Sequence, residues 1–545
     1  MTGPDDVLGR ARAWAADDPH AGDRAEVEAL VAAGDTAELA RRFTGPLTFG
    51  TAGLRGPLRA GPAGMNAAVV TRAAAGLARH LADTGHAGAG VVIGYDARHR
   101  SEEFARTSAA VLSGAGFAVS VLPRPLPTPV LSFAVRHLGA VAGVVVTASH
   151  NPPQDNGYKV YLGDGAQLVP PADRAIEAAI AAVGPAREVP LSDDWRTLGD
   201  DVEGGYIAAV VDALQPGRVP LADRQRLRVA YTAMHGVGSA TTRRVFDAAG
   251  FAPLHVVAQQ DRPDPAFPTV AFPNPEEPGA VDLLVDLAVE VGASVAIAED
   301  PDADRCSVVC DGRQLTGDEV GVLLADWLLR RGVRGTYARS LVSGSLLGEL
   351  ARAHGVPAEE TPTGFKWIIR AGSPEAPLAF GYEEALGYAV TPSVAHDKDG
   401  VSAALAVALL AAELAADGRT LPDRLDELAV EHGLHATGQL SVRVEDLTLI
   451  SDAMARLRAA PPAQLLGRDV EVADLAEADP PVDAVRLRGD GVRVIVRPSG
   501  TEPKLKAYLE TVVPVRDPAG VPAARSRGAA ELDRLRTEMS TALGL

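Results

Sequence analysis

The chain has few cysteines. Its 545 residues include only Cys306 and Cys310, and both lie in the segment CSVVC. If that segment is a strand, at about 3.3 Å per residue, the two backbones are about 13 Å apart, which is beyond the reach of a disulfide. We therefore expect two free thiols and a protein of a reducing compartment, most simply the cytoplasm.

A long apolar run is also missing. The longest one, VSAALAVALLAA from Val401, covers 12 residues before Glu413 interrupts it, whereas a membrane-spanning helix needs about 20. The N-terminal segment MTGPDDVLGRARAW has acidic residues where an export signal has a basic start followed by an apolar run. We expect no membrane segment and no export signal.

Positive charge is in short supply. The formal net charge is −19, whereas proteins that bind the phosphate backbone of nucleic acids usually carry a basic face or stripe. This balance argues against a nucleic-acid partner. A small anionic ligand would need local Arg and Lys residues, placed in glycine-rich turns.

The composition and the order of the segments predict a multidomain α/β protein. Hydrophobic residues make up 47 % and charged residues 23 % of the chain, which is typical of a folded globular protein. The first 45 residues look helical, and three cycles of β-branched runs and helix-length segments follow. The last hundred residues have an α+β pattern. We predict four domains, at residues 1–200, 201–312, 313–430 and 431–545.

The segment AEDPDADR carries three alternating carboxylates, Asp300, Asp302 and Asp304. In an extended segment such residues point the same way, about 6 to 7 Å apart, and a divalent cation would relieve their repulsion. Oxygen ligands suit Mg²⁺ or Mn²⁺. The alternative is a solvated acidic turn. An EF-hand is excluded, because its sixth position is Arg305 where glycine is needed and its twelfth is Asp311.

The segment RPSGTEPK has the composition of an anion-binding turn. We expect it between a strand and a helix, where backbone N–H groups, hydroxyl groups and flanking cations gather around an anion. An arginine there can bind two phosphate oxygens at once. The alternative is an ordinary Ser-Gly turn. The residues concerned are Arg497, Ser499, Gly500, Thr501 and Lys504.

Other polar segments suit a sugar ligand. FGYEEALGY places Glu383 and Glu384 after a short strand, where carboxylates can accept hydrogen bonds from neighbouring hydroxyl groups; a solvated acidic helix start is the alternative. The segments DKDG, TGFKWI and FGTAGLRG add Lys398, Lys366, Thr51 and Arg55. Each predicted domain thus contributes one polar loop, and a shared central cleft would collect them.

Ser149 stands in VVVTASHNPPQDNGYKVY, after a run typical of a buried strand. It is either a capped turn or a nucleophile, and no Gly-x-Ser-x-Gly elbow surrounds it, so a standard hydrolase is a weak explanation. Phosphorylation fits better, because a phosphoserine would supply a fourth anionic ligand to the aspartate cluster. His150 and Lys159 are near in sequence as proton-transfer or phosphate-contacting groups.

Together these motifs resemble the α-D-phosphohexomutase superfamily, which includes phosphoglucomutase, phosphomannomutase and phosphopentomutase. TASHNPPQDNGYK is similar to its phosphoserine loop, DPDADR to its metal loop, GYEEALGY to its sugar loop and RPSGTEPK to its phosphate loop, in the family's order. WAADDP, FGTAGLRG, TGFKW and DKDG resemble the long-chain branch that contains phosphoglucomutases and phosphopentomutases. The resemblance covers nearly the whole chain.

The resemblance implies a role for each matching residue. Ser149 would be the phosphorylated residue and, with Asp300, Asp302 and Asp304, a ligand of one Mg²⁺ ion. Arg305 would lie beside the transferring phosphate, and Glu383 would bind sugar hydroxyl groups. The distal phosphate would be bound by Arg497, Ser499, Gly500 and Thr501, with Arg55, His150, Lys159 and Lys398 assisting chemistry and Thr51 and Lys366 contacting substrate.

The implied fold has three similar α/β domains and a smaller C-terminal domain around a central cleft. The implied reaction interconverts glucose 1-phosphate and glucose 6-phosphate through a sugar 1,6-bisphosphate, by a monomer or dimer. Mannose or pentose phosphates are the alternatives, because the sugar loop departs from both patterns: Ala385 replaces a serine common in glucose-preferring members, and Tyr388 replaces a histidine frequent in phosphomannomutases. A Mg²⁺-dependent sugar-phosphate phosphatase and a non-enzymatic sensor are the rival functions.

Overall fold

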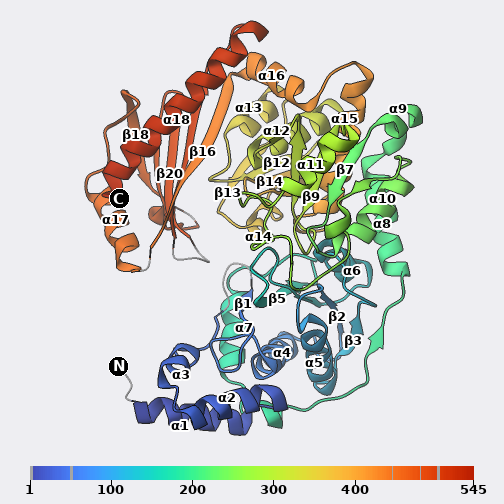
Figure 1. The fold of residues 1–545 in the computed structure, drawn as a ribbon, viewed down its shortest axis with the longest axis vertical. Helices are drawn as coiled ribbons and strands as arrows, with labels where there is room; N and C mark the ends of the chain where they lie inside the picture. Colours follow the sequence, from blue (N-terminus) through green and yellow to red (C-terminus); the bar gives the residue numbers. More distant parts are fainter. Residues whose placement is uncertain (1–3, 49–52, 445, 479, 500–503) are drawn as a thin grey trace. The chain divides into compact units, whose positions relative to one another are not determined.

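Two compact units make up the chain, whose elements are labelled in Figure 1. The computed structural model describes residues 4–48, 53–444, 446–478, 480–499 and 504–545. The first unit contains Met1–Gln314 and Gly387–Ala412, and the second contains Leu315–Leu386 and Glu413–Leu545.

Three helices precede the first sheet, as predicted for the first 45 residues: α1 (Pro4–Asp17), α2 (Ala21–Ala33) and α3 (Thr36–Arg42). Their apolar side chains form a small core of their own, which includes Val27 and Leu39. Asp23 of α2 is buried, and its two carboxylate oxygens accept hydrogen bonds from the guanidinium of Arg100 at 2.8 and 2.9 Å. This ion pair connects the three helices to Arg100, in the turn that follows strand β2.

The first sheet has six strands in the order β1-β5-β4-β2-β3-β6. Strands β2, β3, β4 and β6 are parallel, β5 is antiparallel to β4, and β1 is antiparallel to β5. The strands are β1 (Leu54–Pro57), β2 (Gly90–Tyr95), β3 (Ala118–Val121), β4 (Ala142–Val146), β5 (Asp155–Leu162) and β6 (Arg196–Thr197). The turn between β4 and β5 carries Ser149.

Helices cover this sheet. Alternate side chains of β2, such as Val91 and Ile93, pack in one core with α4 (Ala67–Asp83), α5 (Ser101–Gly114) and α7 (Ala172–Ala181). Helix α6 (Thr128–His137) lies against β2 and β4. It begins next to the aspartate loop of the second sheet, since Thr128 N donates to the carbonyl oxygen of Asp302 at 2.9 Å.

The second sheet has five strands in the order β11-β10-β9-β7-β8. Strands β7, β8 and β9 are parallel, and β10 is antiparallel to β9. The elements are α8 (Asp201–Leu214), α9 (Leu221–Arg226), β7 (Val229–Thr232), α10 (Gly238–Ala248), β8 (His255–Val256), α11 (Asp282–Val291), β9 (Val295–Glu299), β10 (Cys306–Cys310) and β11 (Arg313–Gln314). The strand prediction for CSVVC is confirmed, and both cysteines are buried and not joined in a disulfide.

The segment 387–412 returns to the first unit and holds β15 (Gly387–Ala389) and most of α15 (Gly400–Ala416). Two buried tyrosines anchor it: Tyr161 donates to Asp397 Oδ2 at 2.6 Å and Tyr206 donates to Asp399 Oδ1 at 2.7 Å. Lys398, between the two aspartates, is thereby placed among the other charged residues of the first unit.

The second unit begins with an α/β region. Its parallel strands lie in the order β13-β12-β14. A capping box formed by Thr316 and Glu319 starts its first helix. The elements are α12 (Gly317–Arg330), β12 (Thr336–Ser340), α13 (Leu346–Ala353), β13 (Ala358–Thr361), α14 (Phe365–Ile368), β14 (Leu378–Glu383) and α16 (Leu421–His432).

The chain ends in an antiparallel sheet in the order β16-β21-β20-β19-β18-β17, and α18 packs against β16 and β21 (Figure 1). The elements are β16 (Leu434–Arg443), α17 (Thr448–Ala459), β17 (Gln464–Leu465), β18 (Arg468–Asp474), β19 (Val485–Gly489), β20 (Val492–Pro498), β21 (Lys504–Val513) and α18 (Val521–Leu543). The predicted class, mixed α/β domains followed by a smaller α+β domain, is confirmed.

One local prediction is wrong. The segment RPSGTEPK does not lead from a strand into a helix, because β20 is followed by strand β21. In β21 the side chains of Leu505, Ala507 and Leu509 are buried and alternate with less buried ones, which is the period of a strand and not of a helix. The next described element after this segment is therefore a strand, and the expected helix N-terminus is not among the described residues.

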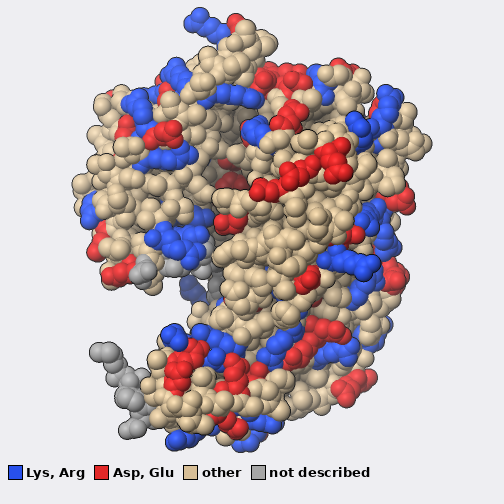
Figure 2. Space-filling model, in the orientation of Figure 1, with Lys and Arg blue, Asp and Glu red and all other residues tan. Residues whose placement is uncertain are grey.

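Charges of both signs lie interspersed over the face shown in Figure 2. Among the described residues, no single helix is both long and apolar enough to span a membrane. Helices α15 and α16 pass such a test only as a pair, with a bend of 84° between them. The apolar side chains of α15, including Leu405 and Leu409, are buried within the protein.

Candidate active site

Ser149 occupies a strained position in the turn after β4. Its φ of 52° lies in the left-handed region that side-chain-bearing residues rarely adopt. Two hydrogen bonds fix its peptide: Ser149 N donates to Thr147 Oγ1 at 2.8 Å, and Arg98 Nη2 donates to Ser149 O at 2.6 Å. The residue is buried, with 2 % of its surface exposed.

The hydroxyl group of Ser149 points to the aspartate loop. Ser149 Oγ donates to Asp300 Oδ2 at 2.8 Å and lies 3.2 Å from His150 Nδ1. Two residues separated by 151 positions in the chain thus meet where the ends of two strands, β4 and β9, come together. This contact joins the serine and aspartate motifs into one site.

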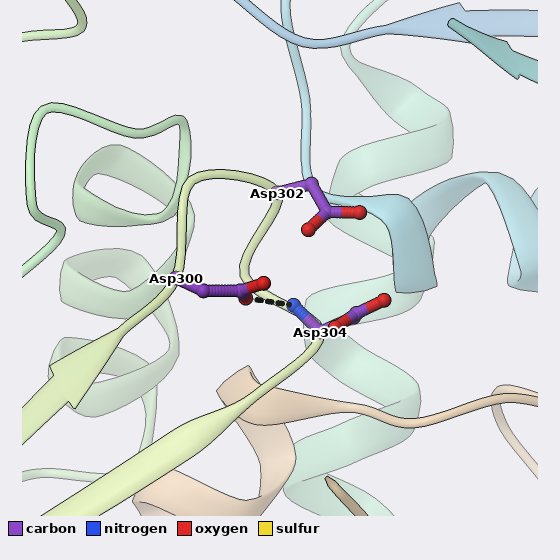
Figure 3. A group of neighbouring side chains, drawn as sticks. All are labelled: Asp300, Asp302 and Asp304. Carbon is purple, nitrogen blue, oxygen red and sulfur yellow. Dashed lines mark hydrogen bonds between the residues drawn. The ribbon is translucent and has the colours of Figure 1, made fainter. Parts of the chain in front are cut away.

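The aspartate loop gathers three fully buried carboxylates (Figure 3). Carboxylate oxygens of Asp300, Asp302 and Asp304 all lie within 4.8 Å of one another. The prediction of an extended segment is wrong: the loop turns between β9 and β10, Ala303 has a φ of 55°, and Asp304 N donates back to Asp300 Oδ1 at 3.1 Å. The turn, rather than strand alternation, brings the carboxylates together.

Two lysines lie against this cluster. Lys159 Nζ donates to Asp302 Oδ2 at 2.7 Å and to Asp304 Oδ2 at 2.9 Å, and Lys398 Nζ is 3.2 Å from Asp304 Oδ2. The other oxygens, Asp302 Oδ1 and Asp304 Oδ1, are buried without a hydrogen-bond partner among the described residues. Buried oxygens in this state are costly unless something binds them, so the donor set fits a hard cation.

The charges around the cluster shift its pKa values in opposite directions. Burial and the charges of Asp302 and Asp304 raise the pKa of Asp300 well above its usual range. Burial also acts to raise the pKa of Asp304, but Lys159 and Lys398 outweigh it and lower that pKa. A bound cation would favour the ionised form of all three aspartates.

Further cationic side chains lie near the serine turn and the aspartate loop. Arg55 Nη1 donates to Asn151 Oδ1 at 3.1 Å, and Arg305 Nε is 4.0 Å from Asp304 Oδ1. The backbone N of Arg305 donates to Asp300 Oδ1 at 3.1 Å. The pKa of His150 lies well below its usual range, because the ring is buried and Arg305 and Arg55 are near. A neutral imidazole therefore stands next to Ser149 Oγ.

Four more of the predicted residues are described, and they lie in the second unit. Glu383 ends β14 and Lys366 is in α14, with its Nζ 5.9 Å from the ring centre of Trp367. Arg497 is in β20, and Ser499 N donates to the carbonyl oxygen of Lys504 at 2.8 Å. Thr51, Gly500 and Thr501 lie outside the described residues.

Glu384, beside the predicted Glu383, has a defined environment. Its Oε2 accepts hydrogen bonds from Ser340 Oγ at 2.9 Å and Ser343 Oγ at 3.0 Å, and its backbone N donates to Ser343 Oγ at 3.0 Å. Burial and the neighbouring charge of Glu383 raise the pKa of Glu384 to about 7. This carboxyl is therefore protonated in part at neutral pH.

The sequence reasoning missed two residues of the first unit's cluster. Arg98 is buried under the serine turn, and Thr128 Oγ1 donates to Asp302 Oδ2 at 2.7 Å. The segment DAR that contains Arg98 directly follows strand β2, so a charged residue at the carboxyl end of a parallel strand was the available signal. Thr128 carries no such signal.

Family models for four consecutive domains match the chain. They are the alpha/beta/alpha domains I, II and III of phosphoglucomutase/phosphomannomutase at residues 46–187, 205–313 and 316–431, and the C-terminal domain at residues 440–516. The matches follow one another in the order of the sheets described above.

Individual proteins match over most of their length. The chain is 44 % identical over 461 residues to a protein of Haemophilus influenzae named "Probable phosphomannomutase", covering 82 % of this chain and 93 % of that one. It is 34 % identical over 544 residues to the phosphopentomutase of Mus musculus, covering 90 % and 87 %. The open-form crystal structure of parafusin (phosphoglucomutase) from Paramecium has the same fold, with a TM-score of 0.70, 18 % identity and coverage of 92 % and 96 %.

These matches, with the serine and carboxylate cluster, define an isomerase that works as an intramolecular phosphotransferase. The chain belongs to the phosphoglucomutase/phosphomannomutase family, as its motifs predict. Enzymes of this family use a metal ion, and the buried Asp300, Asp302 and Asp304 form a group that could bind one. Nothing in the comparisons favours the phosphatase alternative.

Proposed function

We propose that this enzyme interconverts glucose 1-phosphate and glucose 6-phosphate, with Ser149 as the phosphoryl carrier. The observation that supports it most is the 2.8 Å hydrogen bond between Ser149 Oγ and Asp300 Oδ2. It places a strained, buried hydroxyl group next to carboxylates of which two oxygens have no hydrogen-bond partner among the described residues, where a metal ion and a phosphoryl group can meet.

One Mg²⁺ would be held by Asp300, Asp302, Asp304 and the oxygen of Ser149 or its phosphate. When bound, the ion neutralises charge on the transferring phosphoryl group. Lys159, Lys398 and Arg305 add positive charge to the same region. The residues present therefore suit an anionic transition state even though the protein's net charge is negative.

The reaction has two transfers. In the first, the P–Oγ bond of phospho-Ser149 breaks and a bond forms to the free hydroxyl oxygen of the sugar phosphate; that hydroxyl loses its proton and Ser149 Oγ gains one. The product is a sugar 1,6-bisphosphate, which turns over in the site. In the second, its other phosphoryl group returns to Ser149 Oγ, which loses its proton, and the sugar oxygen that releases the phosphoryl group gains one. Free bisphosphate would also act as the activator that first phosphorylates Ser149.

The remaining roles are proposals from the family motifs. Arg55 and His150 would assist chemistry in the first unit. Thr51 and Lys366 would contact the substrate, and Glu383 would bind its hydroxyl groups. The distal phosphate of the substrate would be bound by Arg497, Ser499, Gly500 and Thr501. We also propose the four domains at residues 1–200, 201–312, 313–430 and 431–545, a cleft shared by their loops, and a cytoplasmic monomer or dimer.

Glucose is proposed over mannose because the sugar loop ends in Tyr388, where phosphomannomutases often have histidine, and because the early motifs resemble the phosphoglucomutase and phosphopentomutase branch. Two matches support the alternatives, since one protein is named "Probable phosphomannomutase" and another phosphopentomutase. Mannose and pentose phosphates are therefore the substrates to compare.

The test is ³¹P NMR of the enzyme with Mg²⁺, glucose 1-phosphate and a trace of glucose 1,6-bisphosphate. We expect glucose 6-phosphate to appear without inorganic phosphate. Parallel tubes with mannose 1-phosphate and ribose 1-phosphate measure relative preference. Faster conversion of either would reassign the sugar, release of inorganic phosphate would indicate a phosphatase, and no conversion of any of the three would contradict the proposed mutase.

A further inference from the structure

Arg98 lies directly beneath the serine turn. Its side chain is fully buried, and its guanidinium group donates hydrogen bonds to backbone carbonyl oxygens of four residues in this turn. Nη2 donates to Ser149 O at 2.6 Å and to Asn151 O at 2.5 Å, and Nη1 donates to Pro152 O at 2.8 Å and to Asp155 O at 3.2 Å.

Few side chains could replace this guanidinium. Its donors are arranged in a rigid planar fork, so one group can hold several carbonyl oxygens at fixed directions, whereas a lysine ammonium is a compact charge on a flexible stem. The four carbonyl groups point to one centre only because the backbone from Ser149 to Asp155 is wrapped around it. Arg98 therefore links four carbonyl groups between Ser149 and Asp155 through one side chain.

The strained conformation of Ser149 depends on this arrangement. A non-glycine residue in the left-handed region costs about 1 kcal/mol or more and persists only where its surroundings enforce it. Here the enforcing bonds are those from Ser149 N to Thr147 Oγ1 and from Arg98 Nη2 to Ser149 O. Together they fix both peptide groups of Ser149 and aim its Oγ at Asp300.

Arg98 is itself held in place. Its Nε is 3.3 Å from Asp96 Oδ2, its backbone N donates to Asp96 Oδ1 at 2.9 Å, and its guanidinium carbon lies 4.9 Å from the ring centre of Phe267. Asp96 in turn accepts a hydrogen bond from Ser101 Oγ at 2.6 Å. The turn after β2 thus presents a pre-oriented guanidinium to the turn after β4.

We infer that Arg98 is a positioning residue, which holds Ser149 in the conformation that phosphoryl transfer requires. The inference rests on the proposed role of Ser149 as the phosphoryl carrier. Arg98 acts through the backbone, so its loss should slow transfer from the serine while leaving substrate binding nearly unchanged. A misplacement of about 1 Å costs roughly 100-fold in such a step.

The experiment compares Arg98→Lys with Arg224→Lys in the full-length enzyme. Arg224 is a matched control, because its guanidinium also donates to backbone carbonyl oxygens, those of Val219 and Ala249, away from Ser149. Rapid-quench measurement of phosphoryl transfer from phospho-Ser149 to the sugar phosphate gives the rate of the step. Steady-state kinetics give KM, and amide hydrogen exchange of residues 147–156 reports the order of the turn.

For Arg98→Lys we expect transfer to slow by about 100-fold with KM changed less than threefold, and faster exchange in the serine turn. Arg224→Lys should change neither. A transfer rate no lower than that of Arg224→Lys, or unchanged exchange, would overturn the inference. If the proposed mutase function is wrong, the wild type itself will transfer no phosphoryl group. The hydrogen-exchange comparison of the two variants would in that case still test whether Arg98 orders the serine turn.

Discussion

Lys159 Nζ lies 2.7 Å from Asp302 Oδ2, and both side chains are buried. The same ammonium group reaches Asp304 Oδ2 at 2.9 Å. The lysine therefore binds one oxygen of each carboxylate, and each Oδ1 has no hydrogen-bond partner among the described residues. Lys159 on the Oδ2 atoms and a metal cation on the Oδ1 atoms would together neutralise the negative charge of the aspartate loop.

Replacement of Lys159 by methionine tests this division of charge. Removal of one partner of a buried ion pair leaves uncompensated charge and typically costs about 3–5 kcal/mol, so we expect a loss of that order in the free energy of unfolding in the presence of a chelator. Mg²⁺ should recover more stability in Lys159→Met than in the wild type, because it would replace the missing charge. Urea unfolding with and without Mg²⁺ measures both. An equal effect of Mg²⁺ on the two proteins would contradict the idea.

Asp302→Asn should weaken metal binding with little change in volume. We expect the affinity for Mn²⁺, measured by calorimetry or electron paramagnetic resonance, to fall by about 100-fold or more, since even outer-shell changes cost 10–100-fold. The matched control is Asp311→Asn, an exposed aspartate in the next turn of the chain, between β10 and β11. If both variants bound Mn²⁺ like the wild type, the aspartate cluster would not be the metal site.

Ser149→Ala removes the proposed covalent carrier. We expect a folded protein whose mutase activity is lower by orders of magnitude, and whose Mn²⁺ affinity falls far less than that of Asp302→Asn, because three carboxylates remain. Incubation with ³²P-labelled glucose 1,6-bisphosphate should label the wild type and not the variant. Near-normal activity in Ser149→Ala would remove the serine from the mechanism.

Glu384 predicts a pH dependence of stability. Its pKa is raised from the usual 4.5 to about 7, so the folded state binds the proton more tightly than the unfolded state. The stabilisation is complete below about pH 4.5 and is lost as pH rises through about 7. In Glu384→Gln, which keeps a hydrogen-bond acceptor for Ser340 and Ser343, stability should change less with pH over this window. Denaturant unfolding from pH 5 to 8 measures it, with the exposed Glu375→Gln as control.

Glu510 predicts the opposite dependence. It accepts hydrogen bonds from Arg493 Nε at 2.8 Å and Ser345 N at 2.7 Å. Burial acts to raise its pKa, but Arg493 and His435 outweigh burial and lower it. Its stabilisation is therefore present above the usual glutamate range and is lost as pH falls below it. Glu510→Gln should destabilise the protein by about 3 kcal/mol at pH 7, and by less at pH 3. A difference that stays constant between these pH values would contradict the assignment.

The sequence predicted the members of the first unit's cluster better than their geometry. Ser149, Lys159 and the three aspartates were recognised from local motifs, and they meet in the structure as expected. The alternation of Asp300, Asp302 and Asp304 suggested an extended segment. The backbone instead turns there, because the segment connects the antiparallel strands β9 and β10. The helix predicted after the RPSGTEPK turn is the strand β21. Its alternation of Lys504 and Lys506 with the buried Leu505 and Ala507 is the period of a strand.

Long-range contacts to the backbone could not be predicted. Arg98 binds backbone carbonyl oxygens more than 50 positions away in the chain. Because every residue has a carbonyl oxygen, the sequence contains no residue type that identifies the partners of Arg98. Thr128 reaches Asp302 across 174 positions and resembles any helix-starting threonine. Sequence motifs identify groups that do chemistry, whereas the groups that orient them are recognised only in the folded chain.

The route of the chain through the two units limits how this enzyme can be divided. Lys398 reaches Asp304 from a segment that follows residues 315–386 of the other unit. A fragment that ends at Gln314 would keep Ser149 and the three aspartates but lose Lys398, together with the partners of Tyr161 and Tyr206. Truncation or proteolysis after the second sheet therefore removes part of this charged cluster, and a fragment that keeps all of these contacts must extend at least to Asp399.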